Sequence, residues 1–120
     1  MNKVLLVEDH PGIRHVVQIE LERLGFAVII AENGKEGVET AIATKPDLIL
    51  MNSLMPEMDG WQAARILRAD PETKNIPILA ATAMSRPSDI ETWIDAGCND
   101  YIIKPFTFDE LVRKIKALIP

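Results

Sequence analysis

Five polar residues follow short apolar runs of the chain, and their side chains suit a divalent cation and a phosphoryl group. Glu8 and Asp9 are adjacent carboxylates that repel each other, and a hard cation such as Mg²⁺ would satisfy both. Thr82 offers a hydroxyl to a phosphoryl oxygen, and Lys104 offers an ammonium that neutralises an anion. Asn52 carries a neutral amide, which forms hydrogen bonds but is no nucleophile.

Each of these residues could also have an ordinary structural role. Glu8 and Asp9 could form a solvated turn that caps a helix, and Asn52 could be a turn residue. Thr82 could bond a neighbouring carbonyl, and Lys104 could be a surface lysine. Taken together, however, two acids, an amide, a hydroxyl and an ammonium at one end of one sheet predict a site for a divalent cation and a phosphoryl group.

The elements that would bring these residues together are short apolar runs alternating with amphipathic helical patterns. The runs are unbroken by charged residues, which is typical of parallel strands covered on both faces; they are 4–7, 26–31, 48–51, 78–82 and 101–103. Helical stripes lie between and after them, formed by Ile13, Val17, Leu21 and Leu24 and by Phe108, Leu111, Val112, Ile115 and Leu118.

Helix ends are indicated by capping residues. The spacing of a capping box occurs at Asn33 with Glu36, Ser88 with Glu91 and Thr107 with Glu110. Pro11 suits a first helical turn, and Gly25 and Gly97 suit helix ends. We also expect a cis peptide bond between Lys104 and Pro105, since such bonds mark constrained turns.

The strand and helix patterns alternate five times, which predicts an α/β fold with a parallel sheet and right-handed crossovers. In open sheets of this kind, ligands bind beyond the carboxyl ends of the strands, where the strand order reverses. Glu8, Asp9, Asn52, Thr82 and Lys104 all lie at such ends, so the predicted topology brings them to one edge.

Composition limits the class of protein. The 120 residues suit one domain, 1–120, and the net charge of −5 argues against nucleic-acid or membrane-surface binding. No apolar run approaches the roughly 20 residues of a spanning helix. The N-terminus does not read as a signal peptide, so we expect the cytoplasm. Cys98 stands alone, which excludes an intrachain disulfide, and Trp61 and Trp93 are expected to pack on helices.

Four segments resemble the signatures of the response-regulator receiver domains of bacterial two-component systems, of the chemotaxis-regulator type. They are VLLVEDH, DLILMNSLMPEMDG, PILAATA and GCNDYIIKPF, and they occur in the order and spacing of that family over essentially the whole chain. The resemblance implies a flavodoxin-like (βα)5 fold, a doubly wound parallel sheet with strand order 2-1-3-4-5. It also implies a signalling protein, which catalyses only its own phosphoryl transfer and dephosphorylation.

The resemblance also assigns roles to residues. Asp9 would bind Mg²⁺ directly, Glu8 would act mostly through water, and the backbone carbonyl of Leu54 would complete the protein's share of ligands. Thr82 and Lys104 would hold the phosphoryl oxygens. Tyr101 would be the aromatic switch residue that responds to the state of Thr82.

Asn52 departs from the family, which has the phosphate-accepting aspartate at this position. That carboxylate takes a phosphoryl group from a phosphohistidine, and an amide cannot attack phosphorus, so we expect this chain to be phosphorylation-deficient. Mg²⁺ is expected to bind more weakly, because one ligand charge is missing, although Asn52 could still offer the ion one oxygen. Asn52 is either natural or an engineered Asp-to-Asn change, and the persistence of the other site residues favours the second.

The resemblance implies protein partners. A sensor histidine kinase or histidine phosphotransfer protein would dock near the site, and a downstream protein would contact the last two helices and the fifth strand, with a homodimer as a further option. An alternative is a natural pseudo-receiver that acts as a phosphate-independent scaffold. A flavin carrier on the same fold is disfavoured, because Glu8 and Asp9 would repel a flavin phosphate and no phosphate-cradling loop follows the first run.

Overall fold

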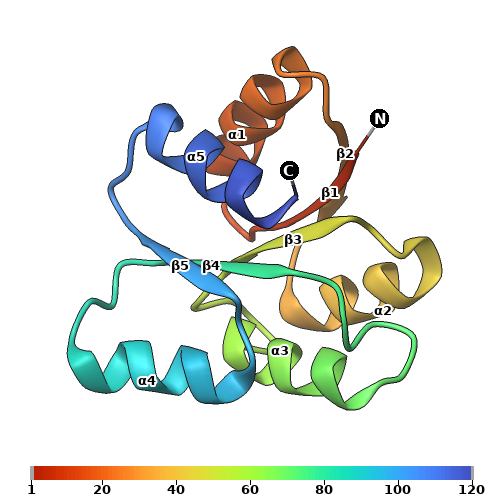
Figure 1. The fold of residues 1–120 in the computed structure, drawn as a ribbon, viewed down its shortest axis with the longest axis vertical. Helices are drawn as coiled ribbons and strands as arrows, with labels where there is room; N and C mark the ends of the chain where they lie inside the picture. The colour runs from red at the N-terminus through yellow and green to blue at the C-terminus, as the bar shows by residue number, and fades with distance from the viewer. Residues whose placement is uncertain (1, 120) are drawn as a thin grey trace.

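The structure is a computed structural model that describes residues 2–119, in which five strands alternate with five helices (Figure 1). The strands are β1 Lys3–Val7, β2 Ala27–Ala31, β3 Leu48–Asn52, β4 Ile78–Thr82 and β5 Asp100–Ile103. The helices are α1 Pro11–Arg23, α2 Gly34–Thr44, α3 Gly60–Ala69, α4 Pro87–Ala96 and α5 Phe108–Leu118. The predicted alternation is confirmed, since each apolar run is a strand.

The five strands form one parallel sheet in the order β2-β1-β3-β4-β5. Helices α1 and α5 cover one face, and α2, α3 and α4 cover the other (Figure 1). This is the flavodoxin-like, doubly wound arrangement that the sequence predicts. The strand order reverses between β1 and β3, so the carboxyl ends of these two strands flank the edge where such folds bind ligands.

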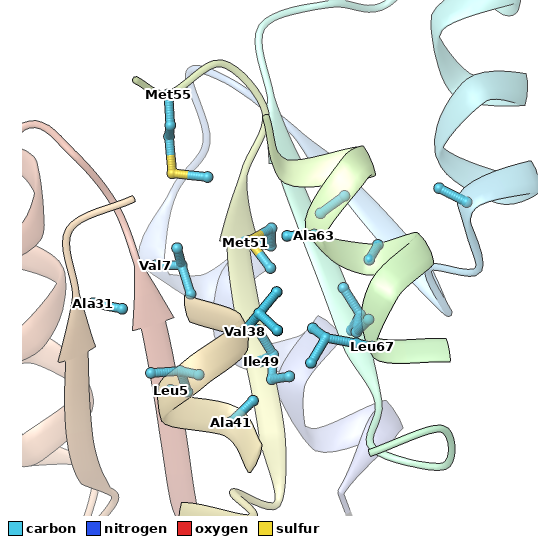
Figure 2. Packing of buried hydrophobic residues seen from close by; sticks show 14 of the residues in the cluster. Leu5, Val7, Ala31, Val38, Ala41, Ile49, Met51, Met55, Ala63 and Leu67 are labelled. Carbon is cyan, nitrogen blue, oxygen red and sulfur yellow. The ribbon is translucent and has the colours of Figure 1, made fainter. Parts of the chain in front are cut away.

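The core consists of two apolar clusters, one on each face of the sheet. One cluster joins Leu5, Ile49 and Met51 to residues of α2, α3 and α4 such as Leu67 (Figure 2). The other joins the opposite faces of the strands to α1 and α5. All five residues of β3 are buried because this central strand is covered on both sides. A rigid strand therefore ends at Asn52.

The helix ends confirm most of the predicted caps. Thr107 and Glu110 form the expected capping box, and the Asn33 side chain accepts a hydrogen bond from the backbone N–H of Glu36 at 2.8 Å. Gly97 ends α4 with a φ of 101°, in the left-handed region that glycine tolerates. The peptide bond between Lys104 and Pro105 is cis, as expected.

Two predictions about helices are wrong. The pairing of Ser88 with Glu91 is not a cap, because α4 begins earlier: Pro87 occupies the first helical turn and Arg86 is the N-cap residue. The apolar stripe of α1 is buried only in its middle. Its ends, Ile13 and Leu24, are 42% and 50% exposed, since the first borders a surface hollow and the second lies past the last helical residue.

The expectations for Cys98 and Trp93 agree with the structure. Cys98 is free and half-buried, and Trp93 is buried. None of the helices within residues 2–119 combines the length and the apolar character needed to cross a membrane.

Candidate functional site

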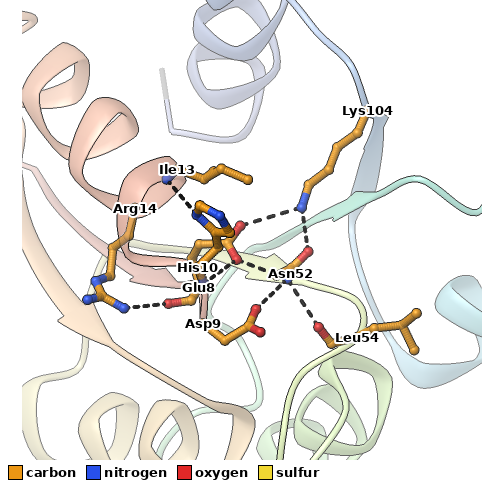
Figure 3. Close-up of polar contacts among 8 residues, drawn as sticks. All are labelled: Glu8, Asp9, His10, Ile13, Arg14, Asn52, Leu54 and Lys104. Carbon is orange, nitrogen blue, oxygen red and sulfur yellow. Dashed lines mark hydrogen bonds and ion pairs between the residues drawn. The ribbon is translucent and has the colours of Figure 1, made fainter.

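The carboxyl ends of β1, β3 and β5 bring four of the predicted site residues together (Figure 3). Glu8 and Asp9 directly follow β1, Asn52 is the last residue of β3, and Lys104 directly follows β5. Neighbouring parallel strands end at the same edge, and the long lysine side chain spans the distance from β5. The predicted clustering of Lys104 with Asn52 is therefore confirmed, with Nζ 2.6 Å from Oδ1.

The amide of Asn52 lies at the centre of this cluster. Its Nδ2 donates to Glu8 Oε2 at 3.1 Å and to Asp9 Oδ1 at 3.0 Å. It also donates to the carbonyl of Leu54 at 3.2 Å, and its Oδ1 accepts from Lys104 Nζ. Turning the amide over would set its oxygen against two carboxylates and its N–H groups against an ammonium. The partners therefore fix one orientation.

Glu8 is the most buried charged group of the site, at 4% exposed. A buried carboxylate is costly unless it is hydrogen-bonded and paired. Its Oε2 accepts from the backbone N–H of His10 at 3.1 Å as well as from Asn52, and its Oε1 lies 3.4 Å from Lys104 Nζ. Both oxygens of Glu8 are thus satisfied by the protein itself.

His10 is a residue of the site that the sequence did not predict. Its Nδ1 accepts a hydrogen bond from the backbone N–H of Ile13 at 3.2 Å, so its imidazole is the N-cap of α1. The signal was Pro11, which suits the first helical turn and so places residue 10 at the cap. Histidine is not among the preferred N-cap residues, which is why the role was not foreseen.

Thr82 lies at the same edge, but its hydroxyl takes no part in the network. Thr82 is fully buried, and its Oγ1 accepts from the backbone N–H of Met84 at 3.0 Å. Its carbonyl accepts from the backbone N–H of Lys104 at 2.8 Å, which ties the ends of β4 and β5 together. The hydroxyl oxygen therefore contacts the segment that follows β4.

Tyr101 is half-buried on β5, and its ring packs against the apolar cluster on the face that α2, α3 and α4 cover. The Nζ of Lys114 lies 5.5 Å from the ring centroid and 3.2 Å from Asp100 Oδ1. The hydrogen bonds and ring contacts of residues 2–119 include none between Tyr101 and Thr82. The role of Tyr101 as a switch residue that responds to the state of Thr82 stays a prediction.

An apolar hollow of about 660 Å³ opens beside the network. Glu8, Asn52 and Lys104 line one part of it. The walls come from α1 and from the segment between β5 and α5, and they include Ile13, Val16, Phe106 and Phe108. The polar cluster is therefore bordered by apolar surface on the face that α1 and α5 share.

The oxygens of the site match a magnesium ion in type but face the amide of Asn52. The carboxylates of Glu8 and Asp9 and the carbonyl of Leu54 are hard ligands. All three converge on Nδ2 of Asn52, so a cation placed among them would meet the amide N–H groups. No group of three or more His, Cys, Asp or Glu side chains is gathered for a metal within residues 2–119. The residues therefore fit Mg²⁺ only after the amide has moved.

Residues 4–116 match the response regulator receiver domain family. The chain belongs to this family. The match includes every residue of the network and all five strands except the first residue of β1.

Relatives of this receiver domain occur within longer regulators. The DNA-binding dual master transcriptional regulator RpaA of Synechocystis sp. is 35% identical over 119 residues, which are 99% of this chain and 49% of RpaA. The transcriptional regulatory protein SrrA of Staphylococcus aureus is 38% identical over 98% of this chain and 48% of its own. The chain thus spans about half the length of the curated relatives it matches.

A solved structure provides a comparison for the site. The receiver domain of the sensor histidine kinase PA1611 from Pseudomonas aeruginosa PAO1 is 37% identical, with a TM-score of 0.92 over 98% of this chain and 97% of that one. That protein was crystallised with a magnesium ion coordinated in its active site cleft. The fold of the receiver domain described here is therefore the fold of a magnesium-binding relative.

Proposed function

We propose that this chain is a receiver domain, residues 1–120, whose site does not accept phosphate because Asn52 occupies the phosphoacceptor position. The observation that carries the proposal is the place of the Asn52 side chain. It lies at the end of β3, between the two acids that follow β1 and the lysine that follows β5. In the family pattern, this is where an aspartate takes the phosphoryl group.

The chemistry of the amide supports a silent site. Phosphoryl transfer needs an anionic oxygen in line with the phosphorus, and Asn52 has a neutral oxygen and a delocalised nitrogen lone pair. Lys104 can stabilise the negative charge on a transferring phosphoryl group only if a nucleophile is present to receive that group. In this chain, the Lys104 ammonium instead donates to Asn52 Oδ1 at 2.6 Å. Whether the asparagine is natural or introduced, the consequence for transfer is the same.

The proposal includes weak magnesium binding. Asp9, Glu8 and the carbonyl of Leu54 would hold the ion, which supplies positive charge beside the transferring group when bound. In this chain, the N–H groups of Asn52 already satisfy these three oxygens. Binding would therefore require displacing the two N–H groups that these three oxygens share, and the site would contribute one negative charge fewer than with aspartate.

The partners that fit this proposal are proteins. A sensor histidine kinase or a phosphotransfer protein would present its phosphohistidine at the network, and a downstream partner would contact α4, β5 and α5, where a homodimer would also form. DNA binding is a property of the relative RpaA. With a net charge of −5, we propose no direct nucleic-acid contact for this domain and a place in the cytoplasm with its kinase.

A second candidate is a scaffold that partners bind in one fixed state. It is favoured by the closed network, in which Glu8, Asn52 and Lys104 satisfy one another without a ligand. The two candidates differ in what an aspartate at position 52 does. A silenced receiver regains phosphate-dependent partner binding with Asn52→Asp, whereas a scaffold binds its partner equally with or without phosphate.

The test of the proposed function is the intact mass of the protein after incubation with acetyl phosphate and Mg²⁺. We expect no phosphate on the chain and base-labile phosphate on Asn52→Asp. The peptide containing Asn52 and Ser53 is checked first, because deamidation would create the aspartate. Stoichiometric phosphate on protein that retains Asn52 would contradict the proposal and direct attention to Asp9 or Glu8 as the acceptor.

A further inference from the structure

Trp93 is a buried aromatic residue whose polar atom has no partner. It lies on α4, is 1% exposed, and meets the ring of Trp61 edge-to-face with centroids 6.2 Å apart. Its Nε1 is the one buried side-chain polar atom in residues 2–119 without a hydrogen-bond partner. Buried indole N–H groups normally find an acceptor, and an unpaired one carries a free-energy penalty. Trp93 thus packs in the core with its indole N–H unpaired.

The backbone of Gly60 connects Trp93 to Asn52. Gly60 is the first residue of α3, and its N–H donates to the carbonyl of Ser53 at 2.8 Å. A Cβ placed on Gly60 would collide with the carbonyl oxygen of Asn52 and would lie 2.6 Å from Cη2 of Trp93. The glycine therefore fills a narrow space between the end of β3 and the indole. There is no free space between the backbone of Asn52, Gly60 and the indole. If the backbone at position 52 moves toward Gly60, Trp93 must therefore move as well.

A second connection reaches Trp93 from β4. The backbone N–H of Met84 donates to the hydroxyl of Thr82 at 3.0 Å. Met84 also lines a small hollow of about 150 Å³, together with Trp61, Trp93 and two further residues of α4, Asp89 and Thr92. The ends of β3 and β4, which carry Asn52 and Thr82, thus both lead to the surroundings of one indole.

The hollow gives the segment between β4 and α4 room to move. The hollow of about 150 Å³ beside the unpaired donor leaves space for a second arrangement of this segment. In the present arrangement, Arg86 and Asp89 hold the start of α4, with Nε and Oδ2 3.0 Å apart. Movement of the Met84 segment into the hollow would bring that segment closer to the indole.

We propose that Trp93 is a positioning residue that transmits a change at residue 52 to α4, through Gly60 on one side and the Met84 segment on the other. In the form with Asn52, the indole N–H stays unpaired and the hollow stays open. A carboxylate at position 52 shifts the equilibrium toward the arrangement in which the hollow closes and Nε1–H gains an acceptor. The inference rests on the proposed function only in taking position 52 as the one that sets the state of the domain.

The direct test uses the indole N–H signal of Trp93 in nitrogen-15 NMR spectra. In a Trp61→Phe background, the Trp93 side chain gives the one remaining indole signal. We expect that signal to move between the Asn52 and Asn52→Asp forms, and to move further in Asn52→Asp with Mg²⁺ and beryllofluoride. Arg65→Met, on the exposed side of α3, is the control and leaves it in place. An unchanged Trp93 signal in both comparisons would overturn the inference. This includes the case in which the indole N–H is bonded to a buried water in every form.

A reciprocal experiment tests the same coupling by changing Trp93 and measuring ligand binding at position 52. If a change at position 52 moves Trp93, then replacing Trp93 must change ligand binding at position 52 by linkage. In the Asn52→Asp background, Trp93→Phe keeps an aromatic ring but removes the N–H, and we expect the Mg²⁺ affinity measured by calorimetry to change by at least about threefold. Arg65→Met, on the exposed side of α3, is the control. Equal affinities for the Trp93 variant and its parent would overturn the inference.

Failure of the inference is distinguishable from failure of the proposed function. If calorimetry shows that Asn52→Asp binds Mg²⁺ but the Trp93 signal does not move, the proposed function stands and the coupling between position 52 and Trp93 is refuted. If protein that retains Asn52 takes up phosphate, the proposed function is refuted, whether or not the Trp93 signal moves. If Trp93→Phe does not fold, the NMR comparison decides alone, since it leaves Trp93 in place.

Discussion

Asn52 satisfies the charged residues around it without a ligand. Its N–H groups face Glu8 and Asp9, and its oxygen faces Lys104, so one neutral side chain separates two acids from each other and pairs with their counter-ion. An aspartate at this position would remove the donors and add a third negative charge beside Glu8, which is 4% exposed. Asparagine thus stabilises the metal-free form of the site.

The first prediction follows from that comparison. Without metal, Asn52→Asp is expected to lower the free energy of unfolding by about 1–3 kcal/mol, because buried carboxylates lose their hydrogen-bond donors. Mg²⁺ is expected to restore it, since the ion binds the folded aspartate form. The measurement is denaturant unfolding in chelator and in Mg²⁺. Asn33→Asp is the matched control, because aspartate also caps a helix. Equal stability of the Asn52→Asp variant and its parent in chelator would contradict the stabilising role of the amide.

Cys98 provides a second prediction at the scale of one residue. Burial, and then the charge of Asp100, raise the pKa of the Cys98 thiol to about 11. Folding therefore favours the protonated thiol. That contribution to stability is fully present below the unfolded pKa of about 8.5 and is lost as the pH rises through about 11. We expect alkylation by iodoacetamide at pH 8 to be slower in the folded protein than in denaturant. Equal rates would show that the thiol is not protected.

At the scale of elements, Arg68 joins the end of α3 to the segment before β4 and to the turn before β5. Its guanidinium donates to the carbonyls of Gly97, Lys74 and Ile76 at 2.8, 3.2 and 2.7 Å, and to Asn99 Oδ1 at 2.6 Å. Burial lowers the pKa of Arg68, which nevertheless remains charged. Three backbone carbonyls therefore accept hydrogen bonds from one side chain, while Asn99 Oδ1 also accepts from the backbone N–H of Ile78 at 2.8 Å.

We expect Arg68→Met to lower the free energy of unfolding by about 2–4 kcal/mol, because these acceptors lose a charged donor. Arg65→Met is the control on the same helix, since Arg65 is exposed and has no hydrogen bond among the described residues. Its effect is expected to stay within about 0.5 kcal/mol. Chemical denaturation of the two variants measures the difference, and comparable losses would refute the role given to Arg68.

The elements were predictable where local sequence decides the structure. The strands were found within one residue, because uninterrupted apolar runs of this length between helical stripes are typical of buried parallel strands. The start of α4 was misplaced, since Ser88 and Glu91 have capping spacing but Pro87 takes the first helical turn. The exposure of Ile13 was also missed, because it depends on the hollow between α1 and the segment before α5.

For the whole molecule, the sequence predicted which residues meet but not how they bond. Parallel strands carry Glu8, Asn52 and Lys104 to one edge, and that follows from topology. The orientation of the Asn52 amide and the direction of the Thr82 hydroxyl depend on neighbours distant in sequence, so no local pattern encodes them. The path from Asn52 to Trp93 likewise exists only in the packed structure, where Gly60 lies between them.

The central claim is that the amide of Asn52 takes the place that a divalent cation would occupy among three oxygens. Calorimetric titration of Mg²⁺ into the chain and into Asn52→Asp tests it most directly, under identical buffer and salt. We predict that the affinity of the Asn52 form is weaker by at least about tenfold, or about 1.4 kcal/mol, because binding must displace its N–H groups and lacks one ligand charge. Equal Mg²⁺ affinities of the two forms would contradict the account.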